Sequence, residues 1–207
     1  IPAEISEKPN AYENNKELEN LFNELCQGYQ RFISFDDLPV PFACVATDIV
    51  AGKEVVLRSG NLADAIRASM AIPGVFSPVV VDGKLLYDGG LLNIFPSDVL
   101  REMGADIIIG IEFSNEKYFF GNKIPTASKL FDYIYNFVIH PKRDENKRFC
   151  DILIKPNTAE FGPFSFTSQA IDTLVSRGYQ AARQNREALL QLKQLLDSIS
   201  GQPVHKR

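Results

Sequence analysis

The sequence predicts an α/β fold, with a mainly parallel central sheet that is covered by helices on both faces. Short, almost wholly apolar runs occur at residues 42–49, 105–113 and 151–155. Runs of this length and composition are typical of strands that are buried on both faces. Amphipathic helical patterns lie between them, and alternation of strand and helix is typical of a parallel sheet.

The N-terminal part is expected to contain one helix and a hairpin. Residues 1–14 are polar, contain two prolines, and are expected to be irregular. Residues 16–28 carry leucine and phenylalanine at helical spacing and end in a glycine, which predicts a helix. The apolar run 42–49 is expected to form a strand, and residues 53–59 are expected to pair back against it.

The next segment contains the clearest local pattern in the chain. Asn61 is placed to cap a helix that the pair Pro73-Gly74 would end. Residues 79–87 contain two apolar runs separated by Asp82-Gly83, which predicts a β-hairpin. Residues 96–103 are expected to form a helix.

The C-terminal half is expected to be mostly helical outside its two strands. Residues 127–138 show an amphipathic helical pattern. The mixed charges of residues 142–148 nearly cancel, and this segment is expected to be a solvated loop. Residues 169–199 carry an apolar stripe interrupted at Asn185-Arg186, so one long helix and two consecutive helices both remain open. Residues 201–207 are expected to be a tail.

Length and charge exclude several classes of protein. With 207 residues, the chain suits one domain or slightly more. Its net charge of −4 is the wrong sign for a nucleic-acid binder, so no nucleic-acid partner is expected. No run of 18 apolar residues and no signal peptide is visible. Because the sequence starts Ile1-Pro2-Ala3 without Met, we expect it to be a piece of a longer protein.

The cysteine and histidine content predicts no metal site and no cofactor. Three widely spaced cysteines form no C-x-x-C pair, and the chain has only two histidines. Cys26, Cys44 and Cys150 are therefore expected to be free and mostly buried thiols.

Asp88-Gly89-Gly90 is the main candidate for a catalytic motif. The carboxylate follows a predicted strand, and ligands bind beyond strand ends in open α/β sheets. The two glycines leave space for a reactant near a carboxylate that could act as a general base. A structural turn is the alternative, because Asp-Gly is common turn chemistry. Asp82-Gly83 has the same dipeptide and is expected to be only a turn.

Two further motifs precede this triplet: an apolar run into Thr-Asp at Phe42 to Asp48, and an Ala-Ser-x-Ala-x-Pro-x-x-Phe string within Ala65 to Pro78. The triplet itself belongs to an Asp-Gly-Gly box at Tyr87 to Gly90, with Asn93 and Pro96 after it. Together these motifs resemble the patatin-like phospholipases, most closely the bacterial branch. The resemblance extends over about residues 36–200 and is looser at 114–165.

The resemblance implies a three-layer α/β/α sandwich and a lipid acyl hydrolase with a Ser-Asp dyad, in which Asp88 is the base. The chain contains neither a Gly-x-Ser-x-Gly nucleophile turn nor a Gly-x-Gly sequence for an oxyanion loop. In the family both lie before the segment that is matched here. Residues 1–200 are therefore expected to be the C-terminal part of a catalytic domain that lacks its N-terminal portion and is inactive alone.

Other residues could take part in function, but structural roles are favoured for them. Ser69 could be a nucleophile, yet its place on a helix face favours packing. The pair Thr47-Asp48 could touch substrate, although a turn is favoured. The aromatic cluster 118–120 could line an acyl channel or contact a membrane surface, while a place in the core is favoured.

Two functions from different classes are consistent with these patterns. The first is acyl-ester hydrolysis, with a lipid or related acyl ester as the substrate. The second is a non-catalytic interaction module that has kept the fold and the Asp-Gly-Gly turn. If strands are missing from the sheet, its free edge is expected to pair with another copy of the chain.

Overall fold

The computed structural model describes most of the chain, namely residues 11–29, 33–73, 75–113, 142–158, 160–161 and 167–200. The aromatic cluster 118–120 and the helix predicted at 127–138 lie outside these residues. The chain divides into two compact units, each of which is described by itself below: residues 1–99 with 139–143, and residues 100–138 with 144–207. That residues 1–200 act as one domain stays a prediction.

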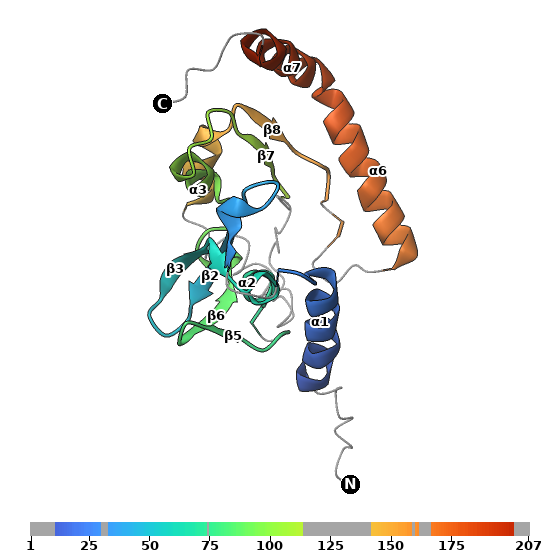
Figure 1. Ribbon diagram of the computed structural model, residues 1–207. Coiled ribbons are helices and arrows are strands. Elements are labelled where there is room, and N and C mark those ends of the chain that lie inside the picture. Colours follow the sequence, from blue (N-terminus) through green and yellow to red (C-terminus); the bar gives the residue numbers. More distant parts are fainter. Residues whose placement is uncertain are drawn as a thin grey trace. The chain divides into compact units, whose positions relative to one another are not determined.

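The first unit is built around a four-stranded sheet (Figure 1). Its strands are β2 (Cys44–Asp48), β3 (Lys53–Leu57), β5 (Val79–Val81) and β6 (Lys84–Asp88), in the order β3-β2-β6-β5. All five residues of β2 are buried, which confirms the prediction of a strand covered on both faces. Both predicted hairpins, β2–β3 and β5–β6, are present.

The α/β class is confirmed, but the direction of the strands differs from the expected one. All three pairings in the four-stranded sheet are antiparallel, and the described strands pair in parallel only between β7 (Ile109–Ile111) and β8 (Ile152–Ile154). Connections as short as those between β2 and β3 and between β5 and β6 can join only antiparallel strands. The apolar composition of β2 reports its burial on both faces and not the direction of its neighbours.

Helix α2 (Leu62–Ser69) packs against β2, β5 and β6. The hydrophobic core of this unit includes residues of both the helix and the sheet. As predicted, Asn61 caps the helix: its Oδ1 accepts hydrogen bonds from the backbone N–H groups of Ala63 and Asp64. The helix ends at Ser69, before the predicted stop. The core residues on the sheet, on α2 and before the sheet are Phe35, Cys44, Ala46, Leu57, Ala65, Ala68, Val79 and Leu86.

Helix α1 (Ala11–Leu25) packs against α2. It begins before the predicted start at residue 16, so residues 11–14 are helical and not irregular as expected. Strand β1 (Ile33–Ser34) pairs with β4 (Ser59–Gly60), and the single turn η1 (Phe35–Asp37) follows β1. Cys26 and Cys44 are buried free thiols, as expected, while Cys150 is half-buried.

The second unit contains the parallel pair β7–β8, which follows helix α3 (Ser97–Glu102) in the chain. Arg101 connects the end of α3 with the segments before both strands. Its guanidinium donates hydrogen bonds to the backbone oxygens of Ala105, Asp106 and Phe149. These bonds fix the segments from which the two strands start.

The expectation of a loop at 142–148 is wrong, whereas Lys142, Asp144, Glu145 and Arg148 are exposed to solvent as expected. Residues 143–146 form α5 (Arg143–Asn146) and the next three form the turn η4 (Lys147–Phe149). Lys147 and Lys155 form ion pairs with Glu112, whose side chain is only 3% exposed. Although burial opposes ionisation of Glu112, hydrogen bonds from both lysines lower its pKa. Lys147 pairs with Asp144 inside this segment, but Lys142 pairs with Glu54 and Lys147 pairs with Glu112 outside it, so the charges do not cancel only among themselves.

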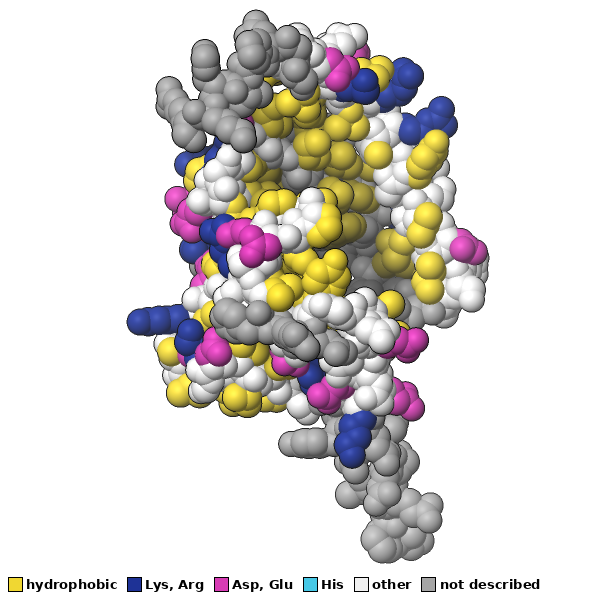
Figure 2. Space-filling view, viewed as in Figure 1, with side chains coloured by type: hydrophobic (Ala, Val, Ile, Leu, Met, Phe, Trp, Pro, Cys, Tyr) yellow, Lys and Arg dark blue, Asp and Glu magenta, His cyan; other side chains and the backbone are white. Residues whose placement is uncertain are grey.

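The C-terminal apolar stripe forms two helices, α6 (Ser168–Gln184) and α7 (Arg186–Ser200), with the break at Asn185. This confirms the second of the two predicted alternatives. Ile171, Val175 and Tyr179 of α6 are exposed, and Figure 2 shows hydrophobic side chains along its surface. Among the described residues, no helix has the length and apolar character that crossing a membrane requires.

Candidate active site

Asp88 is the last residue of β6, the strand next to the fully buried β2. It lies opposite Ala46 in the register of the two strands. The Thr47 hydroxyl donates a hydrogen bond to the Asp88 carbonyl oxygen at 3.0 Å, and the Asp88 N–H donates to the Ala71 carbonyl oxygen at 3.0 Å. The backbone that carries the candidate base is therefore fixed from β2 and from the segment after α2.

The Asp88 carboxylate caps the turn that follows it. Its Oδ1 accepts a hydrogen bond from the Gly90 N–H at 2.7 Å, at the start of the 3-10 turn η2 (Gly89–Leu91). A carboxylate that accepts a backbone N–H is held in one orientation.

Glycine is required at position 89 because a side chain would not fit there, and not because of its backbone angles. A Cβ atom at Gly89 would lie 2.2 Å from the Val45 carbonyl oxygen and 2.9 Å from Val45 Cγ1. The turn after Asp88 therefore runs directly against the backbone of β2. The sequence predicted room for a reactant from these glycines, whereas at Gly89 the room is taken by the neighbouring strand.

A cavity of about 280 Å³ opens at Asp88. Its lining combines the end of β6, the start of β2, the last residue of α2 and the segment after η2. The lining residues are Phe42, Ala43, Cys44, Val45, Ser69, Asp88, Gly89, Gly90, Asn93, Ile94 and Pro96. Most of these side chains are apolar, which suits an acyl chain or another apolar group beside a single carboxylate.

The structure shows the contacts of three residues that the sequence indicated as possible functional residues. Ser69 is half-buried at the end of α2, as expected for a packing residue, and it also lines the cavity with Asp88. Asp48 makes the expected turn, since its Oδ1 accepts from the N–H groups of Val50 and Ala51. Thr47 instead bonds to Asp88, as described above. Burial raises the pKa of the Cys44 thiol to about 12, so this thiol is not a nucleophile in its resting state.

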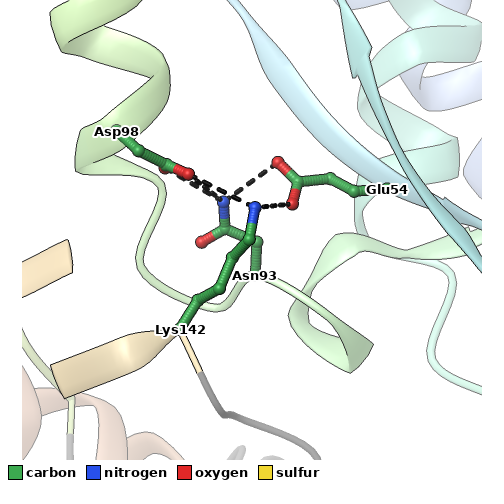
Figure 3. A network of polar contacts seen from close by, with 4 residues as sticks. All are labelled: Glu54, Asn93, Asp98 and Lys142. Carbon is green, nitrogen blue, oxygen red and sulfur yellow. Dashed lines mark hydrogen bonds and ion pairs between the residues drawn. The ribbon is translucent and has the colours of Figure 1, made fainter. Parts of the chain in front are cut away.

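A polar network adjoins the cavity, and most of it was missed from the sequence (Figure 3). Asn93 lines the cavity and donates hydrogen bonds from Nδ2 to Glu54 Oε1 and to Asp98 Oδ1, both at 3.0 Å. Lys142 donates from Nζ to Glu54 Oε2 at 2.7 Å and lies 3.5 Å from Asp98 Oδ2. Only Asn93 belongs to a recognised motif, and no local pattern in the sequence connects Glu54 with Lys142.

The motifs around this site also match known proteins. Residues 12–101 match the family model of patatin-like phospholipases. An uncharacterized NTE family protein of Mycobacterium tuberculosis is 44% identical over 85 residues, which are 41% of this chain and 24% of the relative. Patatin-like phospholipase domain-containing protein 7 of mouse is 36% identical over 100 residues, 47% of this chain and 7% of the relative. The matches thus span a quarter or less of the relatives' length. The part of the chain that carries the motifs around Asp88 is similar to the patatin-like phospholipase family.

Proposed function

We propose that Asp88 is the general base of an acyl-ester hydrolase that acts on a phospholipid or a related acyl ester. The supporting observation is the setting of Asp88: a carboxylate fixed at the end of a strand and opening into a mostly apolar cavity. The match of residues 12–101 to the patatin-like phospholipase family model, and the similarity to a relative with phospholipase in its name, support the substrate class.

The proposed reaction needs a serine nucleophile in addition to Asp88. The base takes the serine hydroxyl proton while Oγ attacks the ester carbonyl carbon, and backbone N–H groups stabilise the resulting oxyanion. Collapse of the tetrahedral intermediate breaks the ester C–O bond, and Asp88 returns the proton to the leaving alcohol. Water then attacks the acyl-serine, Asp88 takes its proton, and the proton returns to serine Oγ as the fatty acid leaves.

The 207 residues contain no serine within Gly-x-Ser-x-Gly. The proposal therefore places the nucleophile and the oxyanion loop outside this sequence, in the gene product of which it would be a part. On this proposal the 207-residue chain alone does not hydrolyse esters. Self-association through an edge strand of the described sheet, β3 or β5, also stays a proposal.

The test compares two aspartates that both precede a glycine. In the full-length gene product, Asp88→Asn should lower the hydrolysis of a p-nitrophenyl acyl ester about 10²- to 10⁴-fold, as expected for the loss of a general base. Asp82→Asn, in the exposed β5–β6 turn, should leave the rate unchanged within about twofold, because surface changes away from a site have small effects.

Labelling with a fluorophosphonate supplies an independent measure of serine activation. The reagent should label the unmodified protein and Asp82→Asn quickly, and Asp88→Asn slowly. If Asp88→Asn hydrolyses ester and reacts with the probe as fast as Asp82→Asn does, Asp88 is not the base. If neither the unmodified protein nor the variants show activity, the non-catalytic interaction module is favoured instead.

A further inference from the structure

The turn from Asp88 to Asn93 is held at both ends by side chains from one pair of strands. Thr47 on β2 and Glu54 on β3 lie directly opposite each other in the β2–β3 register. Residues directly opposite in an antiparallel pair extend on the same face of the sheet. Thr47 holds the Asp88 carbonyl oxygen, and Glu54 holds the Asn93 side chain.

Asn93 is the point where this turn closes. Its backbone N–H donates to the Gly89 carbonyl oxygen at 2.8 Å, and its side chain is buried, with only 2% of the residue exposed. In Figure 3 the Asn93 amide nitrogen lies between the carboxylates of Glu54 and Asp98. A buried amide that donates to two carboxylates fixes both its own side chain and the turn that it ends.

The charges around Asn93 explain why a neutral donor stands at this position. The Lys142 ammonium forms an ion pair with Glu54 and lies 3.5 Å from Asp98 Oδ2. The hydrogen bond to Glu54 raises the pKa of Lys142, so the ammonium form is kept. A third carboxylate at position 93 would be repelled by Glu54 and Asp98, whereas the amide of Asn93 donates to both.

We infer that Asn93 is a positioning residue for Asp88, in that its bonds to Glu54 and Asp98 hold the Asp88–Asn93 turn in the orientation the base needs. This inference rests on the proposed function. It makes Glu54, Asp98 and Lys142 part of the same support, although Asn93 alone of the four lines the cavity. A displacement of about 1 Å in such a group can cost about 100-fold in rate.

The first variant is Asn93→Asp in the full-length gene product, assayed at about pH 9, because burial beside two carboxylates raises the pKa of a carboxyl group above its usual value of about 4. We expect kcat to fall about 10- to 100-fold with KM unchanged within about twofold, because the substrate contacts remain and the base is displaced. Rates are expressed per active site titrated with the fluorophosphonate. Loss of folded protein then does not count as loss of kcat.

The second variant tests the geometry by exchanging the two partners. In Asn93→Asp/Glu54→Gln, an amide at position 54 can donate to a carboxylate at position 93, and the net charge of the network is that of the original. This double variant should recover part of the kcat that Asn93→Asp loses, because the bond to position 54 is restored and the bond to Asp98 is not. Asn146→Asp is the matched control, because Asn146 is 3% exposed and lies in the other unit. It should lower stability and leave kcat per titrated site unchanged.

The role of Asn93 is overturned if Asn93→Asp keeps kcat within about twofold, or if the double variant is as slow as the single one. If Asn93→Asp does not fold, Lys142→Met is the deciding variant, because the Lys142 side chain is 46% exposed and lies outside the hydrophobic core. It should lower kcat several-fold, and an unchanged kcat overturns the inference.

Asp88→Asn is measured in parallel, to separate the positioning role of Asn93 from the proposed function. If it stays active, the proposed function fails. If it is inactive while Asn93→Asp is normal, only the positioning role fails.

Discussion

Asp82-Gly83 and Asp88-Gly89 are the same dipeptide six residues apart, and the fold uses them for opposite purposes. Asp82 and Gly83 form the exposed turn between β5 and β6, with φ of 49° and 75°. Asp88 and Gly89 follow the same hairpin into the interior, where Gly89 is buried against Val45. The first pair makes the chain reverse, and the second brings it against the central strand.

The two glycines show that one residue type meets two separate physical demands. At Gly83 the positive φ excludes most side chains, while a Cβ would have open space around it. At Gly89 the backbone angles are ordinary, and a Cβ would meet the backbone of β2. Substitution at Gly83 therefore costs local strain, whereas substitution at Gly89 must move either β2 or the turn after Asp88.

The largest effect is expected from Gly89→Ala. A Cβ 2.2 Å from the Val45 carbonyl oxygen can be accommodated only if β2 or the turn after Asp88 shifts. We expect the free energy of unfolding to fall by about 3 kcal/mol or more, at the upper end of overpacking effects. Urea denaturation followed by circular dichroism measures this loss.

Gly83→Ala is the matched control for Gly89→Ala. An alanine at φ of 75° should cost about 1 kcal/mol, the usual penalty of an L-residue in the left-handed region. If Gly83→Ala proves the more damaging of the two substitutions, the close approach of Gly89 to β2 does not exist in solution. Equal losses of stability in the two variants would contradict the distinction between a lack of space at Gly89 and backbone strain at Gly83.

The sequence alone predicted the structure of the Asp82-Gly83 turn in full, but predicted only part of the structure around Asp88-Gly89. The β5–β6 hairpin could be predicted because its turn chemistry and its two apolar runs are adjacent in the chain. The strand end that carries Asp88 followed from the same pattern. The contact of Gly89 with Val45 could not be predicted, since it joins residues 44 positions apart that no periodicity connects.

The same reasoning separates the predicted and unpredicted parts of the site. Asp88 was predicted as a candidate base because the Asp-Gly-Gly box is a contiguous motif. Glu54 and Lys142 were not, because their contact joins residues 88 positions apart. The antiparallel pairing of β2 with β6 was missed for a related reason: hydrophobic composition reports burial, while strand direction depends on the connections.

A smaller effect is expected from Thr47→Val, which removes the hydroxyl that holds Asp88. Thr47 is 3% exposed, and its hydroxyl donates to the Asp88 carbonyl oxygen at 3.0 Å. We expect a loss of about 1 kcal/mol in the free energy of unfolding, the typical value for one buried hydrogen bond.

Hydrogen exchange compares Thr47→Val with a change in the exposed Asp82 turn. The change at Asp82 should not alter the protection of the Asp88 segment, whereas Thr47→Val should reduce it. Unchanged protection in Thr47→Val would mean that the β2–β6 pairing alone holds Asp88.

The smallest effect is expected from Asp82→Asn, measured as stability. Asp82 has φ of 49°, which asparagine adopts at least as readily as aspartate, and Asn-Gly is a preferred pair in two-residue hairpin turns. Stability should stay constant or rise by up to about 0.5 kcal/mol, within the usual range of surface substitutions. A loss of more than about 1 kcal/mol would show that the Asp82 carboxylate makes a contact that the turn geometry does not require. Because Asp88→Asn makes the same chemical change one strand later, the pair separates what a carboxylate does for the fold from what it does for catalysis.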